Sequence, residues 1–282
     1  SNLLVLQVEN IDQLLEELQT NNCALWFETG DSNASGGKVV QWNDNGPNDY
    51  DATQSNAGHR PNLVYDDALD TQVVEFEADH SQFDPDSASD PGPGTSDGDY
   101  LTVSRDVDQL DVDENAGFVI VATLKVDEFA RGGTWTVGKA GVPGREFSMR
   151  TCSSYAFDGC EYDDPEGQWR GQHWGTADID FSSGPNSAGK WLILTHAYDG
   201  RAVSIRVNGQ EVARRSVDLN LSADRDMQLG RWVRLDDDPH YYFDGRMAEL
   251  TVFDRELATS ELRAVEEYMS ETHGIPLNGP SG

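Results

Sequence analysis

Two short segments combine aromatic rings with planar polar side chains, the residue types that bind sugars. One is GQWRGQHWG (167–175), and the other is RWVRLDDDPHYY (231–242). Pyranose rings present apolar faces to aromatic side chains, while their hydroxyls bind carboxylate, amide and guanidinium groups. We therefore expect a glycan-binding rim built from residues 145–174 and 231–241. The candidate ligand-binding residues are Arg145, Arg150, Tyr155, Trp169, Arg170, His173, Trp174, Trp232, Arg234, His240 and Tyr241.

The first of these segments also holds the residue types of a polysaccharide lyase. Such an enzyme moves a proton with Tyr or His and neutralises a uronate carboxylate with Arg. The candidates are His173, Tyr155, Tyr162 and Arg150. A lyase acting on a uronate-containing glycan is therefore the enzymatic alternative. Non-catalytic glycan binding asks less of the sequence and is the interpretation we prefer.

Acidic residues gather at 84–99 and at 236–238, and they predict a calcium site. Calcium takes about six to eight oxygen ligands, often carboxylates. Neither segment matches the EF-hand loop, so this prediction rests on composition. An adhesion domain that grips a peptide or protein through calcium is a second alternative. The candidate ligands are Asp84, Asp86, Asp90, Asp97, Asp99, Asp236, Asp237 and Asp238.

The overall charge excludes several partners. The 282 residues carry 51 Asp and Glu against 20 Lys and Arg, which gives a net charge of −31. Such a surface repels phosphates, so the charge argues against binding to nucleic acids and to anionic membranes. No apolar run approaches the roughly 20 residues that a membrane span needs. We expect an extracellular glycan as the partner, or else a peptide or protein.

The three cysteines indicate the compartment. Cys152 and Cys160 bracket a short Gly-containing segment and predict a disulfide bond, while Cys23 reads as a small buried hydrophobic residue. Disulfides persist in oxidising environments. The pattern therefore favours an extracellular or cell-surface location.

Hydrophobic periodicity predicts many strands between two short helices. The helices are expected near residues 10–19 and after residue 258, where Gly274 ends the second one. Two segments, 84–100 and 152–181, read as long loops. Many strands with helices only at the ends indicate an antiparallel sandwich. The clearest strands are predicted at 118–126, 191–198, 202–207, 210–212 and 247–253.

Several stretches resemble the laminin-G-like branch of the concanavalin-A-like lectin/glucanase superfamily. They include ALWFETGDSNASGGKVVQWNDNGPNDYDATQ (24–54), KWLILTHAYDGRAVSIRVNGQEV (190–212) and YYFDGRMAELTVFDRELATSELRAVEEYM (241–269). The resemblance implies an all-β fold, a two-sheet antiparallel jelly-roll sandwich over residues 23–276. An N-terminal helix and lead-in (1–22) would precede it, and a tail (277–282) would follow. These motifs specify the fold rather than the function, since the superfamily includes lectins, adhesion modules, glycosidases and lyases.

Overall fold

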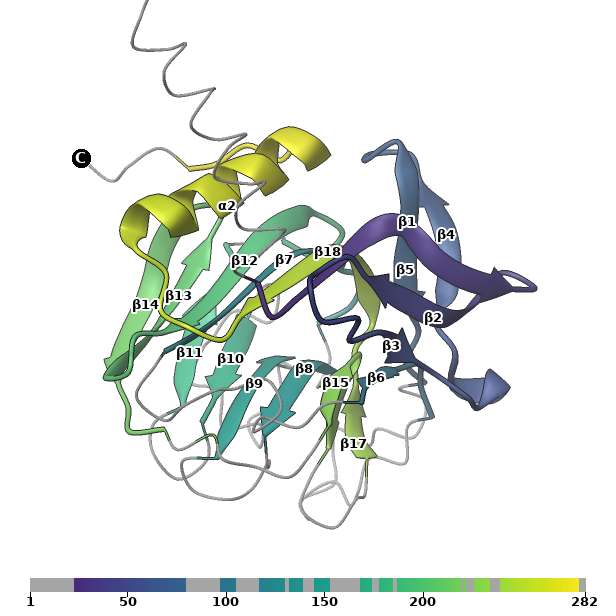
Figure 1. Cartoon of the computed structure of the whole chain (residues 1–282), viewed down its shortest axis with the longest axis horizontal. Helices are drawn as coiled ribbons and strands as arrows, with labels where there is room; N and C mark the ends of the chain where they lie inside the picture. The colour runs from purple at the N-terminus through teal and green to yellow at the C-terminus, as the bar shows by residue number, and fades with distance from the viewer. Residues whose placement is uncertain are drawn as a thin grey trace, which may run out of the picture.

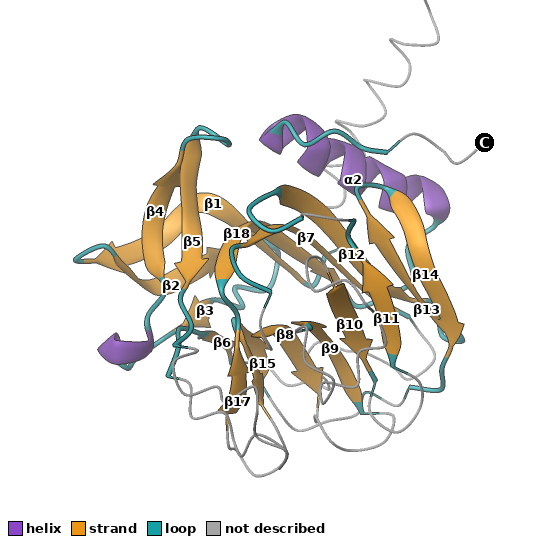
Figure 2. Cartoon of the chain, turned by 180° about the vertical axis from the view of Figure 1, so that it is seen from behind, coloured by secondary structure: helices purple, strands orange, loops and turns teal. Residues whose placement is uncertain are grey.

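Two layers of antiparallel strands form the body of the protein (Figure 1, Figure 2). The all-β jelly-roll prediction is confirmed. The helix predicted near residues 10–19 lies outside the described part of the chain. The computed structural model describes residues 23–79, 97–104, 117–129, 132–138, 145–152, 168–173, 178–184, 187–219, 221, 226–233 and 239–278.

The first layer contains the strands that the sequence predicts most clearly. Neighbouring strands in this layer pair antiparallel throughout. In spatial order they are β14 (Gln210–Ser216), β13 (Ala202–Val207), β12 (Trp191–Tyr198), β7 (Phe118–Val126), β18 (Gly245–Phe253), β5 (Thr71–Phe76) and β4 (Asn62–Asp66).

The second layer carries the segments expected to bind a ligand. Its strands are β11 (Ile179–Ser182), β10 (Gln168–Gln172), β9 (Glu146–Thr151), β8 (Gly132–Gly138), β15 (Met227–Leu229), β6 (Leu101–Val103), β3 (Ala52–Thr53) and β2 (Lys38–Asp44). Strand β1 (Leu25–Ser35) pairs with both β18 and β2 and so joins the two layers. The hairpin of β16 (Arg231–Val233) and β17 (Pro239–Tyr242) contacts β8.

The main hydrophobic core lies between the layers, and a smaller one lies outside the first layer. Alternate side chains of a strand point to opposite faces. In β7, Ile120 and Leu124 therefore join the main core, while Val119 and Val121 join the smaller one. This explains why the β7 sequence is apolar at nearly every position.

Helix α2 (Thr259–His273) covers the smaller core and packs against β7 and β12 (Figure 1). Val265 and Met269 on its inner face are fully buried. The Glu261 carboxylate accepts a hydrogen bond of 2.7 Å from the Ala258 backbone N–H, which satisfies one donor at the start of the helix. Gly274 ends it in the left-handed conformation with φ 65°. No helix in the described ranges is long and apolar enough to cross a membrane.

The prediction of a long loop over residues 152–181 is wrong. Strands β10 and β11 lie within it and pair along four positions. Trp169 and Gly171 face the core side of β10, whereas Gln168, Arg170 and Gln172 alternate with them. This period of two is typical of a strand, and the glycines in the segment obscured it.

Candidate functional site

The outer face of β9 and β10 is polar. In β9, Phe147 and Met149 belong to the main core, so Ser148 and Arg150 between and after them point to the other face. Apolar residues would be expected to alternate with exposed polar ones, yet Ser148 is 0% exposed and Arg150 is 5% exposed. The sequence therefore builds a polar surface that is nevertheless buried.

Strand register brings these side chains together. Ser148 lies opposite Gln172, and Arg150 lies opposite Arg170. On the other side of β10, Arg170 lies opposite Asp180 of β11. Directly opposed residues of neighbouring strands have Cβ atoms only about 4.5–5.5 Å apart, so these side chains interact. We call this group the polar face; it consists of Ser148, Arg150, Gln168, Arg170, Gln172 and Asp180.

In the polar face, Ser148, Gln168 and Gln172 each have a buried atom without a hydrogen bond. Within the described residues, Ser148 Oγ, Gln168 Nε2 and Gln172 Oε1 form no hydrogen bond. The two glutamines are 2% and 4% exposed. A buried polar group without a hydrogen bond costs about 1–3 kcal/mol, and nearly all such groups in native proteins are satisfied. The three atoms together comprise a hydroxyl, an amide donor and an amide acceptor.

Arg170 is held in place by two aspartates. Its Nε and Nη2 atoms lie 2.6 and 2.7 Å from the two carboxylate oxygens of Asp180. Its Nη1 lies 3.6 Å from Asp178 Oδ2. The other oxygen of Asp178 accepts a 3.0 Å hydrogen bond from the His173 backbone N–H. The bidentate pair with Asp180 thus fixes the orientation of the guanidinium group.

The second predicted segment meets the same layer. Trp232 Nε1 donates a 2.5 Å hydrogen bond to Glu146 Oε1 at the start of β9. The Trp232 ring stacks on half-buried Tyr241 at a centroid distance of 5.4 Å. A Cβ at Gly133 of β8 would lie 2.1 Å from the Trp232 nitrogen, so only glycine allows this close approach. Trp232 of the second segment and Glu146 of the first therefore lie side by side.

Two predicted ligand-binding residues point into the protein interior. Trp169 is 0% exposed, stacks on Phe181 and donates a 2.9 Å hydrogen bond to Ser183 Oγ. His173 is also 0% exposed. The alternation along β10 turns both side chains toward the core, on the opposite side of the strand from the polar face. Both residues were expected at the binding rim, and the structure corrects that expectation.

His173 belongs instead to a buried histidine pair. Its Nε2 lies 3.0 Å from Nε2 of His196 on β12. The His196 ring stacks on Phe147 with 3.6 Å between centroids. Burial, with a further contribution from His173, holds the pKa of His196 well below its usual value. His196 is therefore neutral in the core at neutral pH.

The acidic calcium candidates fall mostly outside the described residues. Of the eight, Asp97 and Asp99 are described, and each faces a basic side chain: Asp97 lies 3.0 Å from His59 Nδ1, and Asp99 lies 3.7 Å from Lys38 Nζ. Across the described ranges, no group of three acidic, histidine or cysteine side chains is arranged to hold a metal ion. The calcium site stays a prediction.

The remaining predicted residues are placed as follows. Cys152 is buried and disulfide-bonded, whereas Cys23 is a free buried thiol. Arg145 is half-buried just before β9, and His240 lies in β17, although its side chain is not described. The positions outside the described residues are Tyr155, Cys160, Tyr162, Trp174, Arg234, Asp84, Asp86, Asp90, Asp236, Asp237 and Asp238.

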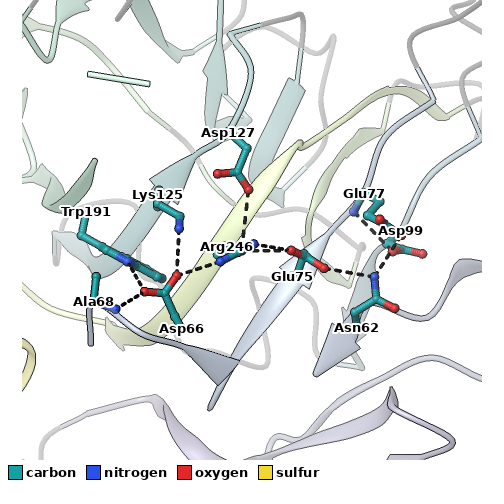
Figure 3. Close-up of polar contacts among 10 residues, drawn as sticks. All are labelled: Asn62, Asp66, Ala68, Glu75, Glu77, Asp99, Lys125, Asp127, Trp191 and Arg246. Atoms are coloured by element: carbon teal, nitrogen blue, oxygen red, sulfur yellow. Dashed lines mark hydrogen bonds and ion pairs between the residues drawn. The ribbon is translucent and has the colours of Figure 1, made fainter. Parts of the chain in front are cut away.

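A second polar cluster, the ionic network, lies on the outer side of the first layer (Figure 3). The buried Asp66 carboxylate accepts hydrogen bonds of 2.8 Å from Lys125 and from Arg246, and one of 3.1 Å from Trp191 Nε1. Arg246 also pairs with Glu75 at 2.8 Å. Burial works to raise the pKa of Asp66, but the bonds from Lys125 and Arg246 outweigh it and hold this pKa well below the usual range.

Two carboxylates beside this network, Asp99 and Asp244, have raised pKa values instead. Burial raises the pKa of Asp99 to about 6, although nearby Lys38 opposes the shift. Burial, together with Asp127 and other acidic neighbours, raises the pKa of Asp244 to about 6. These groups take up protons just below neutral pH.

The sequence analysis missed four residues of the polar face: Ser148, Gln168, Gln172 and Asp180. They carry no motif, and we singled out rings and charges instead. The available signal was the alternation in EFSMRT (146–151) and QWRGQH (168–173), which places polar side chains on one face of two strands.

These features define a two-layer antiparallel jelly roll with a polar outer face. The family profile described as the Concanavalin A-like lectin/glucanases superfamily matches residues 94–263, more than half of the chain. The chain belongs to this family, and the resemblance seen in the sequence is confirmed.

Solved structures support the same fold. The binding domain of Paraclostridial Mosquitocidal Protein 1 aligns with a TM-score of 0.53 at 10% identity, covering 88% of this chain and 52% of that one. The receptor binding domain of botulinum neurotoxin C/D mosaic serotype aligns with a TM-score of 0.53 at 11% identity, covering 88% and 51%. This chain thus spans about half of each solved chain. A search of curated protein sequences gives no match.

Proposed function

We propose that this chain is a non-catalytic carbohydrate-binding module that holds a glycan on the polar face. The observation that carries the proposal is the set of three unpartnered buried atoms, Ser148 Oγ, Gln168 Nε2 and Gln172 Oε1. Native proteins rarely leave such atoms unsatisfied, and a ligand that bonds to them recovers the lost interactions.

The chemistry of these atoms suits sugar hydroxyls. A hydroxyl both donates and accepts a hydrogen bond, so it complements the Gln172 acceptor, the Gln168 donor and the Ser148 hydroxyl alike. The polar face lies on strands rather than loops, and residues on regular elements are positioned more rigidly. The stacked Trp232 and Tyr241 rings adjoin it through Glu146 and supply an apolar border.

The alternatives are less well supported. The lyase interpretation named His173, Tyr155 and Tyr162 as proton carriers; the His173 ring lies inside the core, and both tyrosines lie outside the described residues. Two solved domains of the same fold are binding domains, which agrees with a binding role. The Cys152 disulfide supports an extracellular or surface location. The test below also decides whether binding requires calcium and whether the ligand is a peptide instead.

The test is a glycan array followed by calorimetry of the best ligand with three proteins: wild type, Ser148→Ala and Ser204→Ala. Ser204 is the matched control, because it is a buried serine that faces outward from β13 in the first layer. Deleting the Ser148 hydroxyl is expected to weaken binding by about 1 kcal/mol, or roughly fivefold, whereas Ser204→Ala leaves affinity unchanged.

Three results would argue otherwise. Equal affinity of Ser148→Ala and wild type would remove the polar face from the binding site. If no glycan on the array is bound, a peptide or protein ligand is favoured. Ultraviolet absorbance of an unsaturated uronate product would establish the lyase. Repeating the array with a chelator decides whether calcium is required.

A further inference from the structure

We propose that Asp180 makes the polar face selective for neutral glycans and excludes uronate-containing or sulfated ones. The inference rests on the proposed function and specifies the ligand class of that same site. It assigns to Asp180 a specificity role that does not require it to bond the sugar.

The first step concerns the guanidinium group of Arg170. A carboxylate ligand is bound best by a bidentate pair along one edge of an arginine. In Arg170, the edge formed by Nε and Nη2 is already paired with Asp180, at 2.6 and 2.7 Å. The Nη1 atom faces Asp178 at 3.6 Å. Both partners of the pair are well shielded from water, with side chains 12% and 14% exposed. An anionic sugar would have to displace an internal carboxylate of the same charge.

The second step concerns the balance of charge around the unpartnered atoms. Arg150 and Arg170 lie opposite each other in the register of β9 and β10. Asp178 and Asp180 stand beside them, and Glu146 shares their face of β9, so the described residues here supply three carboxylates against two guanidinium groups. The chain as a whole carries −31, and its field repels a polyanion at a distance. Neither the near charges nor the distant ones attract an acidic glycan.

The third step concerns the unpartnered atoms themselves. Gln172 Oε1 is an acceptor and requires a donor from the ligand. A carboxylate or sulfate group is acceptor-only, so it would repel this atom. Separate hydroxyls of a neutral sugar chain can donate to Gln172 and accept from Gln168 Nε2, and they do so without any charge to desolvate.

The experiment measures affinity for matched neutral and acidic polysaccharides: galactomannan and mixed-linkage β-glucan against alginate and polygalacturonate. Wild type is expected to bind at least one neutral polymer, and to bind each acidic polymer at least tenfold more weakly. In Asp180→Asn, the Arg170 edge loses its charged partner. Affinity for the acidic polymers should then rise about tenfold at low salt, while neutral affinity changes less than threefold.

Two further variants serve as controls. Asp218→Asn removes the same charge from an exposed site and should leave both affinities unchanged. The double variant Arg170→Gln/Asp180→Asn removes both charges of the pair and should lose the gain for acidic polymers. Circular dichroism and the melting temperature establish that each variant is folded.

The outcomes separate this inference from the proposed function. Binding of acidic polymers as tight as that of neutral ones by wild type would overturn the inference but retain the glycan-binding module. No binding to any polymer would overturn the proposed function itself. An Asp180→Asn protein that folds without gaining acidic affinity would also overturn the role of Asp180. If that variant fails to fold, the wild-type ratio alone decides, and a ratio below tenfold is contrary to the inference.

Discussion

The two layers of the sandwich carry polar clusters of opposite character. In the ionic network of the first layer, Asp66 is buried and each of its oxygens accepts hydrogen bonds (Figure 3). In the polar face of the second layer, Ser148 and Gln172 are just as buried, yet atoms of both have no partner among the described residues. Burial is therefore common to the two clusters, and they differ in whether the hydrogen bonds of their polar atoms are satisfied.

The largest expected effect comes from breaking the ionic network. Asp66→Ala leaves the Lys125 and Arg246 cations facing each other without the carboxylate between them. Removing one partner from a buried ion pair costs about 3–5 kcal/mol, so we expect a loss of this size in the free energy of unfolding by urea titration. Exposed Asp67→Asn is the control and should change stability by less than about 0.5 kcal/mol. A loss below 1 kcal/mol in Asp66→Ala would show that the network is not structural.

On the polar face, we expect a substitution to weaken glycan binding without a loss of stability. Gln172→Leu replaces an unsatisfied buried amide with an apolar side chain of similar size, which is neutral or stabilising by up to about 1 kcal/mol. The same change should weaken glycan binding about tenfold, measured by calorimetry. The matched control is Gln41→Leu, because the Gln41 amide donates to Asn43 and Asp51. That variant should lose about 1 kcal/mol of stability and keep its affinity. Destabilisation by Gln172→Leu with unchanged binding would mean that the polar face is merely structural.

Much of the first layer could be predicted from the sequence, and little of the polar face could. Strands β7 and β12 begin and end where the hydrophobic runs do, and Asn208-Gly209 adopts positive φ of 49° and 78° at the predicted hairpin. These signals are local. The polar face depends on the register between β9 and β10, which aligns Ser148 with Gln172 across a long separation in sequence. Local patterns do not encode such pairing.

The binding residues were mistaken for a related reason. Trp169 and His173 have the residue types that contact sugars, and their position between glycines suggested a loop. Once β10 forms, alternation decides which side chains face the core, and both rings fall on that side. A shift of one residue in the strand would have turned them to the polar face. Residue type alone therefore does not tell which side chains of a strand face outward.

Mild acid should act in opposite directions on two buried groups outside these clusters, Asp99 and His196. The folded-state pKa of Asp99, about 6, exceeds its unfolded value of 3.8, so Asp99 adds stability as the pH falls from 7 to 5. His196 has a folded-state pKa well below the unfolded value of 6.5, so it removes stability over the same range, because only the unfolded chain takes up the proton.

Two variants separate these contributions. When the pH falls from 7 to 5, the unfolding free energy of Asp99→Asn should decrease by roughly 1 kcal/mol relative to that of wild type, because the variant lacks the stabilisation that Asp99 adds. The unfolding free energy of His196→Gln should increase relative to that of wild type by about as much, because the destabilisation by His196 is absent. Glutamine keeps a hydrogen-bonding group toward His173. Urea titrations at the two pH values measure both shifts. Shifts of the same sign in the two variants would contradict the assignment.

The smallest expected effect tests whether an isolated surface pair behaves like the ionic network. Asp97 lies 3.0 Å from His59 Nδ1, which is shorter than the 3.7 Å between Asp99 and Lys38, but the Asp97 side chain is 74% exposed. Water screens an exposed pair, and such pairs contribute about 0–1 kcal/mol. Asp97→Asn should therefore lower the free energy of unfolding by no more than about 0.5 kcal/mol without calcium. The same urea titration in millimolar calcium examines the predicted ion site, because an Asp97 that binds the ion would cost much more to replace under those conditions. An effect of several kcal/mol without calcium would mean that distance, rather than burial and the number of partners, decides what a polar contact contributes in this protein.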